Sequence, residues 1–561
     1  KMLKSNVVNL QIENIVHLVL KKMQRNPGKI FAIEPDPGLG NGGLGRLASC
    51  LLESFATKQY PAMAYGLRYQ YGIFEQQLWN GVQIETPDPW LRHQNPWEFR
   101  KDDRAVGVAF AGKPLRKENK KGVEVFDVTE YEEVRALAYD FPVVGYKQDA
   151  DFNVVTLRLW TTKESPRNFA LQRFNAGMLD QAAENLSLTD VLYPNDNNEV
   201  GKRIRLKQEF LLASASIQDI IRTHLARFGE IQSLGDKVRI QINDTHPSIV
   251  IIELFRLLLR EHDLGWDEAW DVVKMCCSYA NHTVLKESLE EWNQNRLRYL
   301  LPRQYRLIEK LNLELCEEVR RKFPGDEERV RRMSILEAGQ VRMAHLAIFG
   351  SHKVNGVSAL HTEILKTQIF KDFQEMYPDK FINITNGVTP RRFILLSNPP
   401  LAQFIEERVG KGWIVNLQEV QKLGAFADDS ASQKKFLEIK KEAKQHLLSY
   451  LKEHNPLRDA QGQITGYPYL LGEEALFDMQ IKRIHEYKRQ LMNALHLIIL
   501  YQELKLNPES RKVKRMVFFA GKAAPGYEMA KNVMRLIVAI GKKINSDLTV
   551  SDKLRLLFVE N

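Results

Sequence analysis

A basic segment between positions 482 and 489 holds side chains of the kinds that bind phosphate. Its basic members are Lys482, Arg483, His485, Lys488 and Arg489. An apolar run at 475–480 precedes it, and apolar residues recur at three- and four-residue steps from Ile484 onward, which predicts a strand followed by a helix that begins near Ile484. Lys482 and Arg483 would then lie where a strand turns into a helix, and free N–H groups at that position favour an anion. The sequence therefore predicts a phosphate site rather than the solvated helix face that most charge runs form.

A glycine-rich loop at 38–45 is the second candidate for anion binding. It matches the dinucleotide-binding pattern in two registers, but that pattern also needs an acidic residue about 20 positions later. The stretch at 60–70 contains no acidic residue, so a nicotinamide cofactor is not expected. Gly42 and Gly43 still let backbone N–H groups approach an anion closely, and a helix beginning at Leu44 would add its dipole. A phosphate cradle is predicted, with tight packing of a turn as the alternative.

Polar residues also follow predicted strands elsewhere in the chain. The strand 238–242 runs into Asp244 and His246, and the strand 380–384 precedes Asn386. In open α/β sheets, ligands bind just beyond the carboxyl ends of the strands. Each candidate has a structural alternative, because a His before Pro or an Asn-Gly pair is also common in ordinary turns. For His361 the structural alternative is a histidine packed in the core, and for the polar run at 195–198 it is an ordinary turn.

Length, composition and charge restrict the class of protein. A chain of 561 residues exceeds the size of one core, so at least two domains are expected. No run of about 18 apolar residues is present, which argues against a membrane span, and the four cysteines have no metal-ligand spacing, which indicates reduced thiols in the cytoplasm. The net charge of +10 suggests an anionic partner, but no nucleic-acid module is recognisable, so small phosphates fit better than nucleic acid.

The C-terminal part of the chain alternates between predicted strands and helices. The pattern comprises strand 475–481, helix 484–506, strand 514–520, helix 526–544 and strand 553–559. This is one βαβαβ half of a doubly wound domain, so we expect its second half to be missing from the sequence. We predict an α/β protein with an N-terminal domain at 1–385 and a partial second domain at 386–561. The residues alone predict binding of phosphate and of a hydroxyl-rich molecule.

Ordered sequence blocks extend from the glycine loop to the end of the chain. Besides Gln480–Gln490, they are Gly38–Arg46, Tyr65–Phe74, Asn95–Trp97, Leu192–Asn197, Arg205–Glu209, Asn243–Pro247, Asn281–Val284, Val354–Val357 with His361, Thr385–Arg392 and Gly521–Tyr527. Together they resemble the α-glucan phosphorylases, which include the glycogen, starch and maltodextrin phosphorylases. The resemblance implies a GT-B fold, in which two Rossmann-like domains face a cleft, with the second domain only partly present here.

The resemblance also implies an activity and a cofactor. The family transfers the terminal glucosyl unit of an α-1,4-glucan to inorganic phosphate and yields glucose 1-phosphate with retained configuration. It uses pyridoxal 5'-phosphate through the phosphate group, and the aldehyde is held by a lysine in an Asn-Met-Lys motif. That motif does not occur in this sequence, so no residue here is assigned as the Schiff-base lysine. A cytoplasmic homodimer is expected.

The phosphate-binding roles of the family can be assigned residue by residue. The resemblance implies that Gly42 and Gly43 face the phosphates through backbone N–H groups and that Lys482 binds the cofactor phosphate. It assigns Arg483 and Lys488 to the substrate phosphate, where a guanidinium grips two oxygens and an ammonium supplies charge.

The sugar-binding roles fall on other loops. The resemblance implies that Asn197, His361 and Asn386 hydrogen-bond hydroxyl groups of the glucosyl unit. Asp196 and His246 are expected to line the cleft.

The sequence departs from the family pattern at two places. Asn198 and Glu199 stand where animal enzymes carry two Phe, so an aromatic inhibitor stack is not expected, and Phe393 replaces a usual Trp.

A nucleotide-sugar glycosyltransferase of the same GT-B architecture is one alternative function, although the segment 482–488 and the block at 521–526 argue against it. A non-catalytic glucan-binding protein is the other, because the Schiff-base lysine is missing.

Overall fold

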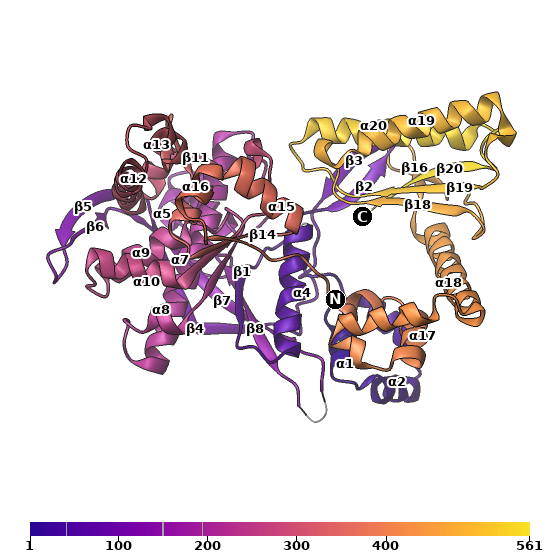
Figure 1. Ribbon diagram of the computed structural model, residues 1–561, viewed down its shortest axis with the longest axis horizontal. Coiled ribbons are helices and arrows are strands. Elements are labelled where there is room, and N and C mark those ends of the chain that lie inside the picture. The colour runs from indigo at the N-terminus through magenta and orange to yellow at the C-terminus, as the bar shows by residue number, and fades with distance from the viewer. Residues whose placement is uncertain (41, 149–150, 193, 561) are drawn as a thin grey trace.

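The computed structural model describes residues 1–40, 42–148, 151–192 and 194–560. Asn41 and Tyr193, which belong to two of the sequence blocks, lie outside the described residues. Figure 1 shows a larger body that contains most of the strands up to β15 and a smaller body that contains α19 and α20. Helices α17 (Pro399–Val409) and α18 (Ser430–His454) lie along the path between them. No described helix is long and apolar enough to cross a membrane.

One sheet of the larger body is mixed and is covered by a long helix. Its strand order is β1 (Met63–Leu67), β8 (Val154–Thr161), β7 (Glu132–Val144) and β4 (Phe99–Phe110), and only the β1–β8 pair is parallel. Helix α7 (Glu199–Phe228) is anchored to this sheet through the buried carboxylate of Asp219. This carboxylate accepts hydrogen bonds from Arg158 Nη1 at 2.6 Å and from the Tyr65 hydroxyl at 2.8 Å. Two donors compensate the buried charge and fix the angle of the helix on the sheet.

The second sheet of the larger body is entirely parallel. Its order is β15 (Phe381–Asn383), β14 (Lys353–Gly356), β10 (Cys277–Ala280) and β9 (Ile240–Asn243). Helices α9 (Val250–Arg260), α10 (Trp266–Cys276) and α14 (Met343–Phe349) belong to the same core cluster. The strands predicted at 238–242 and 380–384 are thus confirmed within two residues, as β9 and β15. Because all four strands are parallel, the loops at their carboxyl ends share one edge of the sheet.

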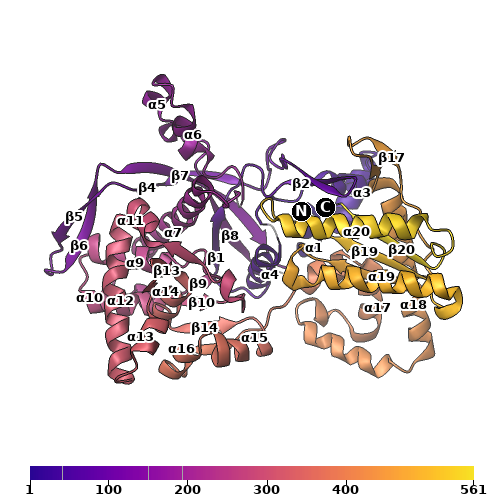
Figure 2. The same ribbon diagram turned by 90° about the horizontal axis from the view of Figure 1, so that it is seen from above.

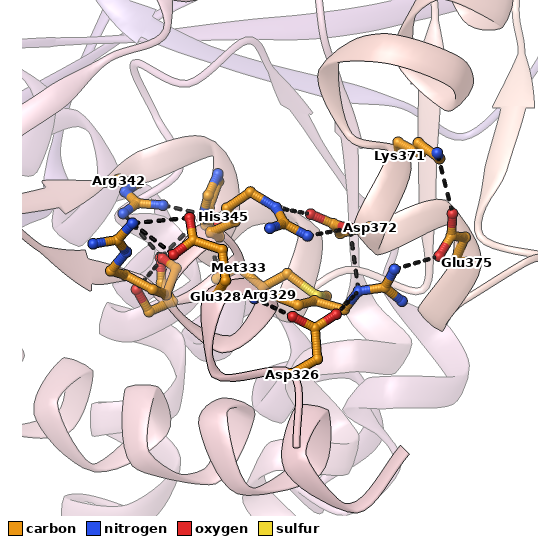
Figure 3. A network of polar contacts seen from close by, with 12 residues as sticks. Asp326, Glu328, Arg329, Met333, Arg342, His345, Lys371, Asp372 and Glu375 are labelled. Atoms are coloured by element: carbon orange, nitrogen blue, oxygen red, sulfur yellow. Dashed lines mark hydrogen bonds and ion pairs between the residues drawn. The ribbon is translucent and has the colours of Figure 1, made fainter. Parts of the chain in front are cut away.

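An ion-pair network joins two helices of this body (Figure 3). Arg329 and Arg332 of α13 (Glu327–Met333) contact Asp372 of α16 (Lys371–Met376), at 3.3 and 2.8 Å. Beside it, His345 Nδ1 lies 3.0 Å from the carbonyl oxygen of Ser334. Burial lowers the pKa of His345 to about 4, so this imidazole is neutral and serves as a packed polar link.

The smaller body contains a parallel three-stranded sheet. It is formed by β18 (Leu476–Ile481), β19 (Arg515–Ala520) and β20 (Leu554–Val559), in that order. Helices α19 (Gln490–Leu506) and α20 (Glu528–Ser546) connect these strands, and Figure 1 shows both on one side of the sheet. The predicted alternation of strands and helices is therefore confirmed, because parallel neighbours need helical crossovers.

The predicted start of the helix after β18 is wrong. Instead of beginning near Ile484, α19 begins at Gln490, and a 3₁₀ turn at Glu486–Lys488 comes first. The His485 side chain caps this turn by accepting a hydrogen bond from the Tyr487 N–H, and Arg489 then has a left-handed backbone with φ of 64°. A left-handed residue interrupts the helical hydrogen-bond pattern. Lys482 and Arg483 consequently lie in a loop at the strand end and not in the first turn of a helix.

The glycine-loop helix is tied to the segment that leaves the larger body. Helix α4 (Gly43–Thr57) carries Glu53, whose Oε2 accepts a hydrogen bond at 2.8 Å from Arg391 Nη2. Arg391 is buried, and its Nη1 donates to the carbonyl oxygen of Ile414 at 2.6 Å. This ion pair joins parts of the chain 338 residues apart and fixes the base of the glycine loop.

The remaining described helices and strands complete the two bodies. They are α1 (Leu3–Asn9), α2 (Glu13–Lys22), α3 (Pro27–Ile33), β2 (Glu75–Trp79), β3 (Val82–Thr86), β5 (Lys113–Glu118), β6 (Glu124–Thr129), α5 (Leu171–Asn175), α6 (Leu179–Ser187), α8 (Leu234–Lys237), β11 (Glu291–Asn293), α11 (Gln294–Leu300), α12 (Pro302–Lys322), β12 (Leu336–Glu337), β13 (Gln340–Arg342), α15 (Ala359–Ile364), β16 (Leu457–Arg458) and β17 (Ile464–Gly466).

Candidate functional site

Polar side chains follow all four strands of the parallel sheet in the larger body. Asp244 comes after β9, His282 after β10, His361 shortly after β14 and Asn386 after β15. Neighbouring loops are joined by direct contacts, since His282 Nε2 lies 2.7 Å from Asn243 Oδ1. The fold thus brings residues from four distant segments to one sheet edge, as the strand-end rule for α/β sheets predicts.

His361 and Asn386 are connected through one backbone unit. The N–H of Asn386 donates to the carbonyl oxygen of Val357 at 2.9 Å, and the N–H of Val357 donates to His361 Nδ1 at 3.0 Å. Burial lowers the pKa of His361, with an opposing effect from the backbone at Thr283. His361 is thus a neutral, half-buried ring between two strand-end loops, whereas Asn386 is exposed.

The ionisable groups of this cluster are mostly neutral near pH 7. Burial lowers the pKa of His246 to about 4, and burial with the nearby His361 lowers that of His282 to about 4. Burial raises the pKa of Asp244 to about 6, although the Thr245 and His282 N–H groups oppose the rise. Asp244 also has a left-handed backbone with φ of 67°, which is uncommon for a non-glycine residue and recurs at functional sites. Neutral imidazoles and amides can both donate hydrogen bonds to hydroxyl groups and accept hydrogen bonds from them.

His282 is the residue of this cluster that the sequence-based assignment missed. Its block, Asn281–Val284, was recognised, but the sugar was assigned to Asn197, His361 and Asn386. The available signal was position, because His282 is the second residue after β10, just as Asp244 is the first residue after β9. Among the described residues, no group of three His, Cys, Asp or Glu side chains could hold a metal ion.

The loop at 195–198 is held from both sides. Arg205 Nη1 of α7 donates to Asp196 Oδ2 at 2.9 Å, and the Asn198 side chain caps α7 by accepting the Gly201 N–H at 2.8 Å. A Cβ atom at Gly201 would lie 1.9 Å from the carbonyl oxygen of Asn195, so only glycine permits this packing. Asp196 is therefore fixed at the start of the helix, and Asn197 projects from the same rigid loop.

Three basic side chains gather after β18 in the smaller body. The pKa of Lys488 is lowered by burial and then by the positive charges of Arg483 and Lys482. Like charges that depress one another in this way mark a place where an anion is favoured. A Cβ atom at Gly42 would lie 3.4 Å from Arg483 Cδ, so the glycine loop of the larger body reaches this group. Gly43, the first residue of α4, has no atom within 4 Å of a Cβ built on it, and its backbone faces open space.

Two glycines of the block after β19 allow close approach of the backbone. A Cβ atom at Gly521 would lie 2.1 Å from the Lys482 carbonyl oxygen, and Gly521 has φ of 143°. At Gly526 a Cβ atom would lie 2.7 Å from Asn197 Nδ2, which donates to the Gly526 carbonyl oxygen at 3.1 Å. The block thus contacts the basic segment at one end and the 195–198 loop at the other.

The β2–β3 hairpin, which Figure 1 shows beside α20 of the smaller body, adds further contacts to the same block. Gln76 Nε2 of β2 donates to the Gly521 carbonyl oxygen at 3.1 Å. Gln83 of β3 donates to the Ala523 carbonyl oxygen at 3.0 Å and accepts the Ala523 N–H at 2.9 Å. These buried hydrogen bonds fix the loop after β19 against the hairpin.

The structure therefore brings two groups of candidate residues together. The first consists of Lys482, Arg483, Lys488 and Gly42, with Gly43 beside it. The second consists of His361 and Asn386 with His246 and His282 in the neighbouring loops. Asp196 and Asn197 lie on a loop that contacts the smaller body. The first group is suited to oxyanions and the second to hydroxyl groups.

Comparison with known proteins identifies the family. A sequence model described as carbohydrate phosphorylase matches residues 20–561. Glycogen phosphorylase from Chlamydia pneumoniae is 43% identical over 566 residues, covering 100% of this chain and 67% of the relative. The muscle form of glycogen phosphorylase from Homo sapiens is 45% identical over 576 residues, covering 100% of this chain and 66% of the relative. The chain thus spans about two thirds of the length of these relatives. The chain belongs to the carbohydrate phosphorylase family.

Proposed function

We propose that the protein is a glycogen (α-1,4-glucan) phosphorylase, a glycosyltransferase that moves the terminal glucosyl unit to inorganic phosphate. The product is glucose 1-phosphate with retained configuration. The observation that carries the proposal is the cluster of Lys482, Arg483 and Lys488, which the glycine loop meets at Gly42. The identity of 43–45% to glycogen phosphorylases across the whole chain supports the same reaction.

The proposed architecture is GT-B, with two Rossmann-like domains that face a cleft. We assign residues 1–385 to the first domain and 386–561 to the part of the second that this chain contains. Support comes from the two parallel sheets, because the loops after β9, β10, β14 and β15 and those after β18 and β19 hold the two groups of candidate residues. Ligands bind at such strand ends in open α/β sheets.

The basic cluster also fits the phosphate of pyridoxal 5'-phosphate. Lys482 is the proposed ligand of that phosphate, and the open space beside Gly43, next to the contact of Gly42 with Arg483, leaves room for phosphate oxygens. When bound, the cofactor would supply a phosphate group that exchanges a proton with the substrate phosphate. No residue of this chain is assigned to its aldehyde.

Arg483 and Lys488 are the proposed holders of the substrate phosphate. Their role is to offset the repulsion between two phosphate groups at close range, which is strong in a site that excludes water. The lowered pKa of Lys488 would return towards its usual value once an anion binds, because the neighbouring positive charges are then compensated.

The sugar is assigned to the strand-end cluster of the larger body. Asn197, His361 and Asn386 are proposed to hydrogen-bond glucosyl hydroxyls, and the structure supports adding His282 to them. Asp196 and His246 would line the same space. Neutral groups can orient hydroxyls without imposing a charge on the reacting carbon, and such contacts fix the sugar as positive charge develops there.

The substrates and assembly follow from the same proposal. They comprise inorganic phosphate, glucose 1-phosphate and an α-1,4-glucan, with a cytoplasmic homodimer as the expected state. The test uses the full-length protein that contains this chain, incubated with maltoheptaose and phosphate in the absence of any nucleotide. Release of glucose 1-phosphate supports the proposal. Glucosyl transfer that needs a nucleotide sugar and ignores phosphate would establish the GT-B glycosyltransferase instead, and glucan binding without turnover would establish a binding protein.

A further inference from the structure

A cavity of about 560 Å³ lies in the larger body, outside both groups of candidate residues. Its walls come from β4, β7, α7, α9 and the first turn of α12. Figure 2 shows these elements on the side of the molecule away from α19 and α20. The volume falls within the range of pockets that bind small molecules. None of its lining residues takes part in the proposed reaction.

Three guanidinium groups line this cavity, one from each helix: Arg222 of α7, Arg256 of α9 and Arg303 of α12. Arg256 is largely compensated, because its Nε and Nη2 donate to the Glu253 carboxylate at 2.8 and 2.9 Å. Arg222 Nη2 donates to Asp219 Oδ1 at 3.0 Å. Its Nε is buried and has no hydrogen-bond partner among the described residues.

Arg303 is the lining guanidinium whose N–H donors have no contact partner among the described residues. Across the described residues, its guanidinium forms no hydrogen bond and no ion pair, although it lies in a half-buried position. Burial and the nearby positive charge of Arg256 lower the pKa of Arg303 to about 10. The carboxylates of Glu253, Asp127 and Glu261 oppose this lowering from a distance, so the group still carries its proton at neutral pH, and its N–H donors are open to an oxyanion.

The other lining residues restrict what that anion can be. Glu133 and Glu261 add negative charge to the walls, which would repel a molecule with several anionic groups and accept hydrogen bonds from hydroxyls. Gln218 and Ser214 add polar atoms, and Leu257 adds apolar surface. A bare inorganic ion would fill little of a cavity this large. The best match is a small molecule with one oxyanion and several hydroxyl groups.

We propose that this cavity is a binding site for a small polyhydroxylated molecule that carries a single phosphate or carboxylate group. Arg303 holds the oxyanion with its two parallel N–H groups, and Arg222 Nε contributes a further donor. Glu133 and Glu261 accept hydrogen bonds from the hydroxyl groups. The site is independent of the proposed phosphorylase reaction.

Calorimetric titration of the full-length protein that contains this chain tests the site with four probes. Glycerol 3-phosphate and gluconate represent the phosphate and the carboxylate source, citrate is a polyanion, and sorbitol is the neutral control. At least one of the first two is expected to bind, more tightly than citrate, and sorbitol is expected not to bind. The Arg303→Gln variant should weaken that binding about tenfold or more, because a charge-assisted pair is lost.

The matched control is Arg320→Gln, which removes the same charge from the same helix at an exposed position that pairs with Glu327. It should bind the probes as the unsubstituted chain does, and so should Arg483→Ala, which separates this cavity from the proposed phosphate site. Because burial and Arg256 together disfavour the Arg303 charge, Arg303→Gln should unfold at the same or a higher temperature than the unsubstituted protein. Absence of binding by glycerol 3-phosphate and gluconate overturns the proposal. It is equally overturned if Arg303→Gln binds normally, or if Arg483→Ala abolishes binding.

Discussion

The Asn197 side-chain amide donates a hydrogen bond to the Gly526 carbonyl oxygen at 3.1 Å, across 329 residues of chain. Asn197 belongs to the loop that Arg205 and the α7 cap hold in place, and Gly526 belongs to the block after β19. The contact therefore connects a candidate sugar-binding loop to the part of the smaller body that also touches Lys482. A substitution on either side of this contact should therefore alter the candidate site while it leaves the hydrophobic cores intact.

Substitution of Gly526 by alanine tests this connection. The new methyl group would lie 2.7 Å from Asn197 Nδ2 and 2.9 Å from Asn195 Oδ1, so the loop must move. We expect phosphorolysis by the full-length protein to fall about tenfold or more, with little change in melting temperature, because small displacements of positioning groups have large effects on rate. Gly424→Ala is the control, since a Cβ atom there meets nothing within 4 Å. Full activity of Gly526→Ala would contradict the assignment of Asn197 to the sugar.

Replacement of Arg483 by alanine tests the anion site. Loss of one charge-assisted pair costs roughly 1.5–3 kcal/mol, so the KM for phosphate should rise, or kcat should fall, by about tenfold or more. The measurement is steady-state phosphorolysis with phosphate varied at a fixed glucan concentration. Arg511→Ala, an exposed site paired with Glu503, serves as the control. Unchanged kinetics for phosphate would remove Arg483 from the site.

Substitution of Gly521 should affect mainly stability, whereas substitution of Gly43 should affect mainly phosphate binding. A Cβ atom at Gly521 would lie 2.1 Å from a backbone oxygen, and φ there is 143°, so Gly521→Ala should lower the free energy of unfolding by on the order of 2 kcal/mol or more. Gly43→Ala meets open space and should leave urea unfolding unchanged while it reduces phosphate binding. A Gly521→Ala protein as stable as the parent would show that the local backbone can relax.

Stability should fall in acid through two buried histidines. The pKa values of His246 and His282 are lowered to about 4, against about 6.5 in the unfolded chain. Between these values the unfolded state binds more protons, so the free energy of unfolding decreases as pH falls from about 6.5 to 4. The contribution of Asp244 to the free energy of unfolding has the opposite sign. Its pKa is raised to about 6, so the folded state gains a proton first as pH falls and is stabilised by it. The two histidines should outweigh it.

Urea unfolding at pH 7, 5.5 and 4.5 measures this dependence. Comparison with His246→Gln isolates one group, because glutamine does not titrate and each unit of pKa shift corresponds to about 1.4 kcal/mol. The variant should lose less stability than the parent over this range. Equal losses in the two proteins would mean that His246 is not held neutral by the fold.

The sequence predicted the local elements of the smaller body because buried parallel strands are short apolar runs and their crossover helices are long and amphipathic. It did not predict the start of α19, since helical periodicity continues through Ile484 and Tyr487. The left-handed Arg489 and the His485 cap, which delay the helix to Gln490, leave no mark on that periodicity.

The composition of the candidate site was only partly predictable for a different reason. Strand ends at Asp244 and Asn386 could be recognised locally, but the sheet order β15-β14-β10-β9 is set by pairing between distant segments. That order places His282 beside Asn243 and near His361. The cavity at Arg303 was not predicted either, because an unpaired charge becomes visible only when all its neighbours are known.

Gln83 pairs with Ala523 as a peptide group in a neighbouring strand would, with one hydrogen bond donated and one accepted. Because one hydrogen bond runs in each direction, the hairpin cannot slide along the block after β19 without breaking both of these buried bonds. The hairpin also contacts the smaller body through the Leu78 N–H, which donates to Glu560, and through Glu85, which pairs with Lys531. In any opening motion the β2–β3 hairpin would therefore move together with the smaller body.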